Sequence, residues 1–108
     1  MKLSDFEKNY VFTTKIEIND EGDYIELREP NQQEFSGFGE DGKKNLETME
    51  KIFPSCIIDS SFVDDEGNKV DSKSIYNTLK KSGSMLTEII TTWIQSIPFQ
   101  SRLLKNKK

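Results

Sequence analysis

Histidine is absent from this 108-residue sequence, and cysteine and tryptophan occur once each. Without histidine, the chain lacks the usual general base near neutral pH and the commonest protein ligand of metal ions. The single cysteine, Cys56, excludes an intramolecular disulfide and favours a reducing, cytoplasmic location over a secreted one. One cysteine and no histidine are also too few ligands for a structural zinc site. We therefore expect no metal and no cofactor.

Long apolar runs are missing as well. No run reaches the roughly eighteen apolar residues that suggest a membrane span, and the N-terminal MKLSDFEKNY lacks the apolar centre of a signal peptide. Hydrophobic residues make up 33% of the chain and charged residues 31%, so the core is expected to be lean. A chain of this length still buries roughly two-thirds of the surface that its unfolded form exposes. We expect a single domain over residues 1–108, with flexible ends at 1–9 and 100–108.

Charge of the two signs is unevenly distributed along the chain. Eighteen acidic and eight basic residues precede Ser72, whereas one acidic and seven basic residues follow from there. This asymmetry fits either attraction between the two parts of one chain or a contact with another subunit or an acidic partner. Nucleic-acid binding would need a basic face with aromatic residues. Because most aromatics lie in the acidic part, we expect no nucleic-acid partner.

The acidic and glycine-rich turns do not match known ligand-binding motifs. An EF-hand loop needs glycine at its sixth position and acids at set positions around it, and no loop placed on Gly22, Gly42 or Gly67 meets this pattern. The stretch 37–42, GFGEDG, contains G-x-G but continues into acids that would repel phosphate. Cys56 precedes two isoleucines and fits a buried, inert thiol. We expect neither an enzyme nor a small-molecule substrate.

Alternating apolar and polar residues predict strands near the N-terminus. The alternation runs from Tyr10 to Ile18 and resumes over 24–28. The short loop between them contains Gly22, which adopts a positive φ without steric cost. The pattern therefore predicts an antiparallel β-hairpin. The stretch 56–59 fits either a third short strand or an extended connector.

The rest of the chain has the apolar spacing of helices. The predicted helices are, in order, a short one opened by Pro30, one over 43–53 ended by Pro54, one capped by Asp71 or Ser72 and ended by Gly83, and one capped by Ser84 and closed by Pro98. A hairpin followed by three or four helices predicts an α+β domain. In such a domain the helices cover one face of a small antiparallel sheet.

The last helix carries the widest apolar stripe of the chain. In the simplest interpretation the whole stripe belongs to the core. In the alternative, the stripe is wider than a small sheet can cover, and part of it contacts another chain. Beyond Pro98, further apolar residues follow at Phe99, Leu103 and Leu104. The stripe consists of Met85, Leu86, Ile89, Ile90, Trp93, Ile94 and Ile97.

Three segments carry a resemblance to a known family. They are YIELREP at Tyr24–Pro30, FPSCIIDSSF at Phe53–Phe62 with the following turn DDEGNKV, and WIQSIPF at Trp93–Phe99. In these segments the chain resembles the small tail assembly chaperones of long-tailed phages and prophages. The resemblance implies a non-enzymatic protein that self-associates in the host cytoplasm. It also implies a client, the tape measure protein, which the chaperone keeps soluble while the tail tube polymerises.

The resemblance brings no catalytic residues with it, so the predicted site is a set of apolar residues that contact the client. We expect these residues to lie at the surface, with Ile90 shared between core and interface. A second hypothesis makes the chain a small acidic adaptor or inhibitor that binds a basic surface of its partner. The predicted client-binding residues are Ile90, Trp93, Ile97, Phe99 and Leu103.

Overall fold

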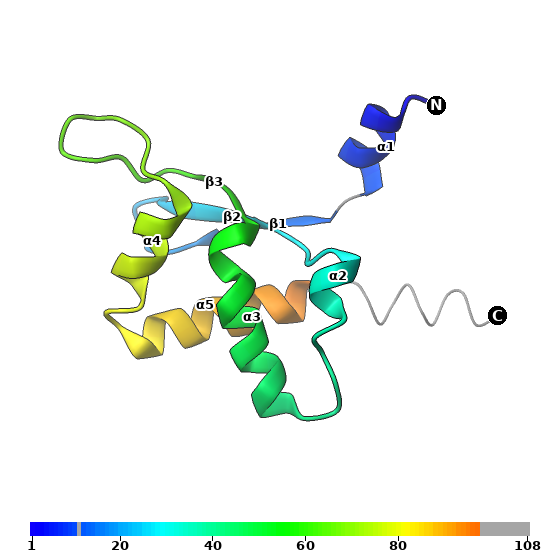
Figure 1. Ribbon diagram of the computed structural model, residues 1–108. Coiled ribbons are helices and arrows are strands. Elements are labelled where there is room, and N and C mark those ends of the chain that lie inside the picture. The colour runs from blue at the N-terminus through cyan, green and yellow to red at the C-terminus, as the bar shows by residue number, and fades with distance from the viewer. Residues whose placement is uncertain (11, 98–108) are drawn as a thin grey trace.

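The computed structural model describes residues 1–10 and 12–97. A hairpin precedes most of the helices, and a further strand lies between the third helix and the fourth (Figure 1). This arrangement confirms the predicted α+β class. The elements are α1 (Leu3–Tyr10), β1 (Thr13–Glu17), β2 (Tyr24–Arg28), α2 (Gln32–Phe35), α3 (Gly42–Cys56), β3 (Ile57–Ser60), α4 (Ser72–Leu79) and α5 (Gly83–Ser96).

The strands form one antiparallel sheet in the order β1-β2-β3. In the predicted hairpin, Ile16 of β1 pairs with Ile25 of β2, and Gly22 in the connecting turn has a φ of 89°. The third strand, which the sequence left open, forms at Ile57–Ser60 and pairs with β2 across an irregularity between Glu26 and Leu27. β2 is therefore the central strand, and β1 lies at one edge of the sheet.

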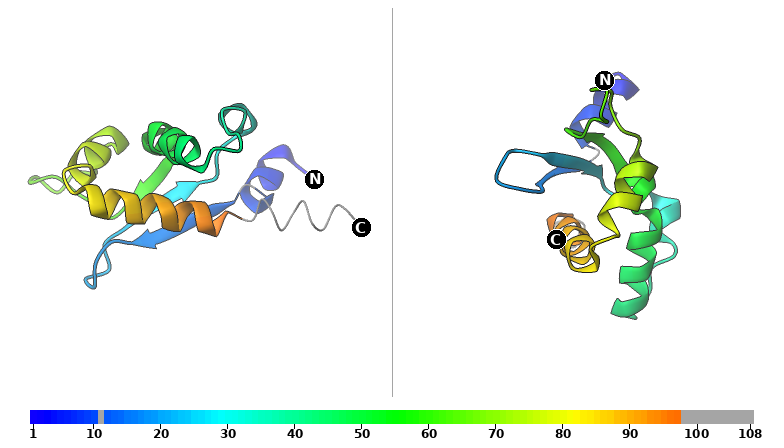
Figure 2. Two further views of the ribbon diagram at one scale, coloured as in Figure 1. Left: turned by 90° about the horizontal axis from the view of Figure 1, so that it is seen from below. Right: turned by 90° about the vertical axis from the view of Figure 1, so that its left-hand side faces the viewer.

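The two faces of the sheet differ sharply in polarity. Ile16, Ile25 and Leu27 are buried on the face against which the helices pack. Lys15 and Tyr24 lie on the other face, where the Lys15 ammonium sits 3.9 Å from the centre of the Tyr24 ring. Figure 2 shows α5 running alongside β1, while α3 continues directly into β3. The helices thus cover only the apolar face, as predicted.

Trp93 of α5 is the centre of the core and is fully buried. Its ring packs edge-on against Phe53 of α3, with 5.8 Å between the ring centroids and 66° between the ring planes. The indole Nε1–H donates a hydrogen bond of 3.2 Å to the backbone carbonyl of Arg28 at the end of β2. One side chain therefore joins the sheet to the two longest helices. The buried apolar cluster comprises Ile16, Ile25, Leu27, Met49, Phe53, Cys56, Ile75, Leu79, Leu86, Ile89, Ile90 and Trp93.

The prediction that Pro54 ends the second main helix is wrong. α3 continues through Pro54 to Cys56. Proline lacks an N–H and so removes one helical hydrogen bond, but here it lies in the last turn, between the fully buried Phe53 and Cys56. Arg28 also satisfies a carbonyl at this end of the helix, because its Nη2 donates 3.3 Å to the carbonyl of Ser55. Burial and this external donor outweigh the lost bond.

The predicted boundary between the last two helices is displaced. α4 ends at Leu79 with Lys80 as its C-cap, and Gly83 begins α5 instead of ending α4. Ser82, not Ser84, is the N-cap: its backbone is extended and its Oγ accepts a 3.4 Å hydrogen bond from the N–H of Met85. A serine three residues before that N–H is correctly placed to cap the helix, and Ser84 is already inside the first turn. The predicted cap of α4 is confirmed, since the Asp71 side chain accepts from the N–H of Ser74.

The N-terminal segment also differs from its prediction. Leu3–Tyr10 form the helix α1, and β1 begins at Thr13 and not at Tyr10, where the predicted alternation started. Apolar side chains of α1 stay exposed, including Leu3 and Phe6. Figure 1 shows α1 standing off from the helices that cover the sheet. The predicted alternation began at Tyr10, which is the last residue of α1, so it extended too far towards the N-terminus.

The central position of Trp93 gives the first prediction. We expect Trp93→Ala to lower the free energy of unfolding by about 3–5 kcal/mol, because it leaves a cavity beside Phe53 and removes the donor to Arg28. Urea denaturation followed by circular dichroism measures the change. The control, Ile94→Ala on the adjacent exposed position, should cost less than about 1 kcal/mol. Equal losses in the two variants would contradict this assignment of the core.

Candidate protein-binding surfaces

The residues predicted to bind a client do not all reach the surface. Trp93 is 0% exposed and Ile90 is 2% exposed, so the expectation that Trp93 lies at the surface is wrong, and of the two places expected for Ile90 the structure shows the core. Both lie near the middle of the α5 stripe, where the sheet and α3 cover them. Ile97, the C-cap of α5, is half-buried against the core. Phe99 and Leu103 lie outside the described residues.

The borders of the same stripe remain exposed. Met85 is 39% exposed and Ile94 is 36% exposed. They are nine positions apart in the sequence, which places them about 180° apart around the helix axis. They therefore lie on opposite borders of the buried stripe formed by Leu86, Ile89, Ile90 and Trp93. The stripe is wider than the surface that covers it, as the alternative interpretation of the sequence proposed.

One border belongs to the C-terminal end of α5. Ile94 is exposed there, one turn before the half-buried Ile97, and together they form what we call the C-terminal surface. The neighbouring Gln95 is exposed and polar. This surface is small, but it is continuous along the chain with the apolar residues that the sequence places beyond it.

The other border opens into a groove between β1 and the N-terminal half of α5, which we call the β1–α5 groove. Its volume is about 460 Å³. Its apolar part is formed by Ile16 and Ile18 from the hairpin and by Met85 and Ile89 from α5. Polar and charged side chains surround this part. They are Thr14, Lys15, Glu17, Ser82, Ser84, Glu88 and Thr92.

Smaller apolar sites lie at the far end of the sheet. Ile58 on β3 and Val63 just beyond it are exposed. A pocket of about 190 Å³ lies between the turn after β3 and α4, and Val63, Val70 and Ile75 contribute to its lining. Such a pocket is large enough for one apolar side chain.

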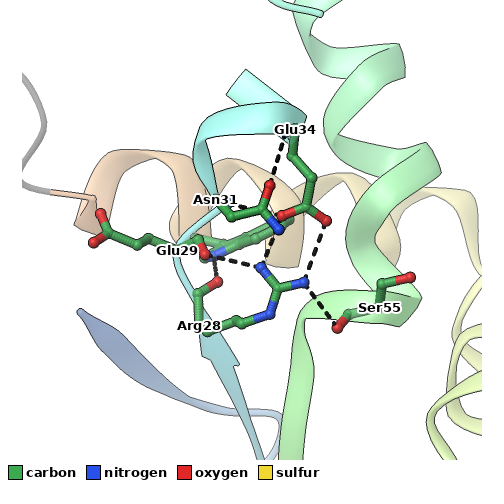
Figure 3. A network of polar contacts seen from close by, with 6 residues as sticks. Arg28, Glu29, Asn31, Glu34 and Ser55 are labelled. Carbon is green, nitrogen blue, oxygen red and sulfur yellow. Dashed lines mark hydrogen bonds and ion pairs between the residues drawn. The ribbon is translucent and has the colours of Figure 1, made fainter. Parts of the chain in front are cut away.

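Arg28 organises the polar contacts at the end of β2 (Figure 3). Its guanidinium binds both carboxylate oxygens of Glu34 on α2, at 2.8 and 3.2 Å, and also reaches the Ser55 carbonyl. Glu34 in turn forms a capping box with Asn31, in which each side chain accepts from the other residue's backbone N–H. The segment that carries part of the family resemblance therefore has a structural role here.

Shifts of pKa follow the same network. The hydrogen bond from Arg28 lowers the pKa of Glu34, and the same bond raises the pKa of Arg28. Burial raises the pKa of the Cys56 thiol to about 12. A thiol in that state is protonated at neutral pH and is a poor nucleophile. Cys56 therefore behaves as the buried, inert thiol that the sequence predicted.

Three further features are absent from the described part of the chain: a metal-ligand cluster, a membrane-spanning helix and a buried polar side-chain atom without a partner. Within residues 1–10 and 12–97, no cluster of three or more potential metal ligands forms. None of the helices in that part of the chain is long and apolar enough to cross a membrane. The described side chains also leave no buried polar atom without a hydrogen-bond partner.

Comparison of the chain with protein-family models, with curated proteins and with solved structures finds no significant match.

The state of Cys56 predicts slow chemical modification. We expect iodoacetamide to alkylate Cys56 in the native protein only as fast as the fold opens, because the thiol is buried and protonated. Mass spectrometry of the alkylated fraction over time measures the rate, and the same protein in urea supplies the unprotected reference. Native labelling at the rate of the unfolded reference would show that the thiol is accessible.

The ion pair of Arg28 and Glu34 predicts a dependence of stability on pH. A carboxyl whose pKa is lowered by folding stabilises the protein above its unfolded pKa of about 4.3, and this contribution is lost as the pH falls through the folded pKa. We expect Glu34→Gln to lower the free energy of unfolding at pH 7 by about 1–2 kcal/mol.

Denaturation of the wild type and of Glu34→Gln across the acidic range tests this. The two proteins should converge in stability once Glu34 is protonated in the wild type. Glu40→Gln, in an exposed turn, is the control and should change stability by no more than about 0.5 kcal/mol. A difference between wild type and Glu34→Gln that is independent of pH would contradict an electrostatic role.

Proposed function

We propose that this protein is a non-enzymatic tail assembly chaperone that binds the tape measure protein, or another tail protein, and keeps it soluble during assembly. The observation that carries the proposal is the exposed C-terminal border of α5. Ile94 is 36% exposed, and it adjoins the buried stripe that Leu86, Ile89, Ile90 and Trp93 form on the same helix. The sequence continues from there into Phe99, Leu103 and Leu104.

An apolar border of this kind suits a helical apolar client. An amphipathic segment binds by laying its apolar face on a matching strip, and Ile94 with Ile97 supplies one strip on a rigid helix. The charged residues that make up 31% of the chain keep the chaperone itself soluble while this strip stays exposed. The strip is also limited in area, which favours contacts that the polymerising tube can displace.

The proposal changes the roles of two residues in the predicted site. Trp93 and Ile90 hold α5 against the sheet and α3, and so fix the position of the C-terminal surface without touching the client. Ile97 keeps its predicted place at the contact. Phe99 and Leu103 are proposed as further contacts on the strength of the sequence.

The acidic adaptor remains a second candidate, and one observation favours it. The turns of the acidic part are exposed, among them Asp65 and Glu66 after β3. A partner with a basic surface would bind such turns through charge, and binding would weaken steeply as salt rises. Binding through the C-terminal surface should persist at moderate salt, since it buries apolar area.

The test of the proposed function replaces Ile94 with Asp. We expect this variant to lose most of its binding to a tagged fragment of the tape measure protein, and the co-expressed fragment to precipitate, because a charge then interrupts the apolar strip. Pull-down and the soluble fraction of the fragment are the measurements, made at low and moderate salt.

Gln95→Asp is the matched control, because it adds the same charge at the neighbouring exposed position. This variant should bind as the wild type does. If Ile94→Asp also binds as the wild type does while both variants stay folded, the C-terminal surface is not the client site. Binding that disappears at moderate salt in the wild type would support the adaptor.

A further inference from the structure

β1 has an unpaired edge that faces the β1–α5 groove. Within residues 1–10 and 12–97, β1 pairs with β2 alone, and no other described segment pairs with its second side. The N–H of Glu29 donates to the carbonyl of Phe12, and the N–H of Ile18 donates to the carbonyl of Asp23. In an antiparallel ladder, inward and outward backbone groups alternate along the strand. The backbones of Thr13, Lys15 and Glu17 therefore point outward, away from β2.

An open strand edge of this kind is a template for another strand. We propose that a second copy of this chain covers it, with the two β1 strands antiparallel and related by a two-fold axis, so that two three-stranded sheets become one six-stranded sheet. This inference stands independently of the proposed function, since it concerns a different border of α5 and a different partner.

Charge selects the register of this pairing. Only the outward-pointing residues can exchange hydrogen bonds across the axis, so Lys15 must lie opposite Thr13, Lys15 or Glu17 of the second copy. Placing Lys15 opposite Lys15 brings like charges together, which destabilises a cross-strand pair. Placing it opposite Glu17 creates two equivalent pairs of opposite charge, one on each side of the axis. No ion pair within the described part of the chain already engages either residue.

The same register matches the apolar side of the strands. With Lys15 opposite Glu17, Ile16 lies directly opposite Ile16 of the second copy, and Thr14 lies opposite Ile18. These side chains point to the face that α5 covers, where Ile16 and Ile18 already line the groove. Isoleucines of the second copy would enter the groove beside Met85, which is the most exposed apolar side chain of α5.

Symmetry makes this arrangement closed. A two-fold axis perpendicular to the sheet puts α5 of both copies on the same face, and each groove receives side chains of the other copy. Pairing also removes the free edge of β1 from both chains, so the association stops at two copies on this side. The outer face, which carries Lys15, Glu17 and Tyr24, stays exposed to solvent, and the Lys15 ammonium leaves its position 3.9 Å from the centre of the Tyr24 ring to pair with Glu17 of the second copy.

Analytical ultracentrifugation across a wide range of protein concentrations tests the pairing. The wild type should show a monomer–dimer equilibrium. Lys15→Glu and Glu17→Lys should each weaken dimerisation about tenfold or more, because each puts like charges opposite one another at both equivalent sites. Glu21→Lys, in the hairpin turn, repeats the charge change of Glu17→Lys away from the edge and should dimerise as the wild type does.

Mixing the two weakened variants provides the decisive measurement. In a heterodimer of Lys15→Glu with Glu17→Lys, each cross-strand pair again joins a glutamate to a lysine, so dimerisation should return to the wild-type level. The double variant Lys15→Glu/Glu17→Lys should also dimerise with itself. A wild type that stays monomeric, single variants that dimerise normally, or a mixture that fails to associate would each overturn the proposal.

Discussion

The buried indole of Trp93 is the interaction on which the rest of this structure depends. It contacts Phe53 of α3 through its ring and the end of β2 through its N–H. The other buried residues of α5 make only apolar contacts, which do not depend on orientation and so do not fix the position of the helix over the sheet. The hydrogen bond to the Arg28 carbonyl does depend on orientation, and it fixes that position. The positions of both exposed borders of α5 follow from this one anchor.

Arg28, whose backbone carbonyl binds Trp93, also makes polar contacts through its side chain. Its backbone accepts from Trp93, while its guanidinium holds Glu34 of α2 and the end of α3. A guanidinium presents several donors in a fixed plane, so it can join two acceptors from different elements, which a lysine ammonium does less well. The end of β2 is thereby connected to three helices. These contacts give a structural reason for an arginine at the last position of the central strand.

Much of the fold could be predicted from periodicity, because alternation and helical spacing report which face is buried. The hairpin, the apolar face of α3 and the cap of α4 were predictable in this way. Pro54 was misread because the local rule against proline ignores the burial of Phe53 and Cys56 on either side of it. The site was less predictable. Periodicity identified the stripe of α5, but only the packing of sheet and α3 shows that its centre is covered and its borders are not.

The hydrogen bond between Trp93 and Arg28 joins residues 65 positions apart in the chain. Bringing such distant residues together costs loop-closure entropy before any contact rewards it. The hairpin, whose strands are close neighbours in sequence, can form much earlier. We therefore expect α5 to dock late in folding, after the hairpin has formed, and to leave part of the apolar face of the sheet open to solvent until then. On this expectation, the rate at which α5 docks sets how long a newly made chain exposes that face, and so how readily it aggregates.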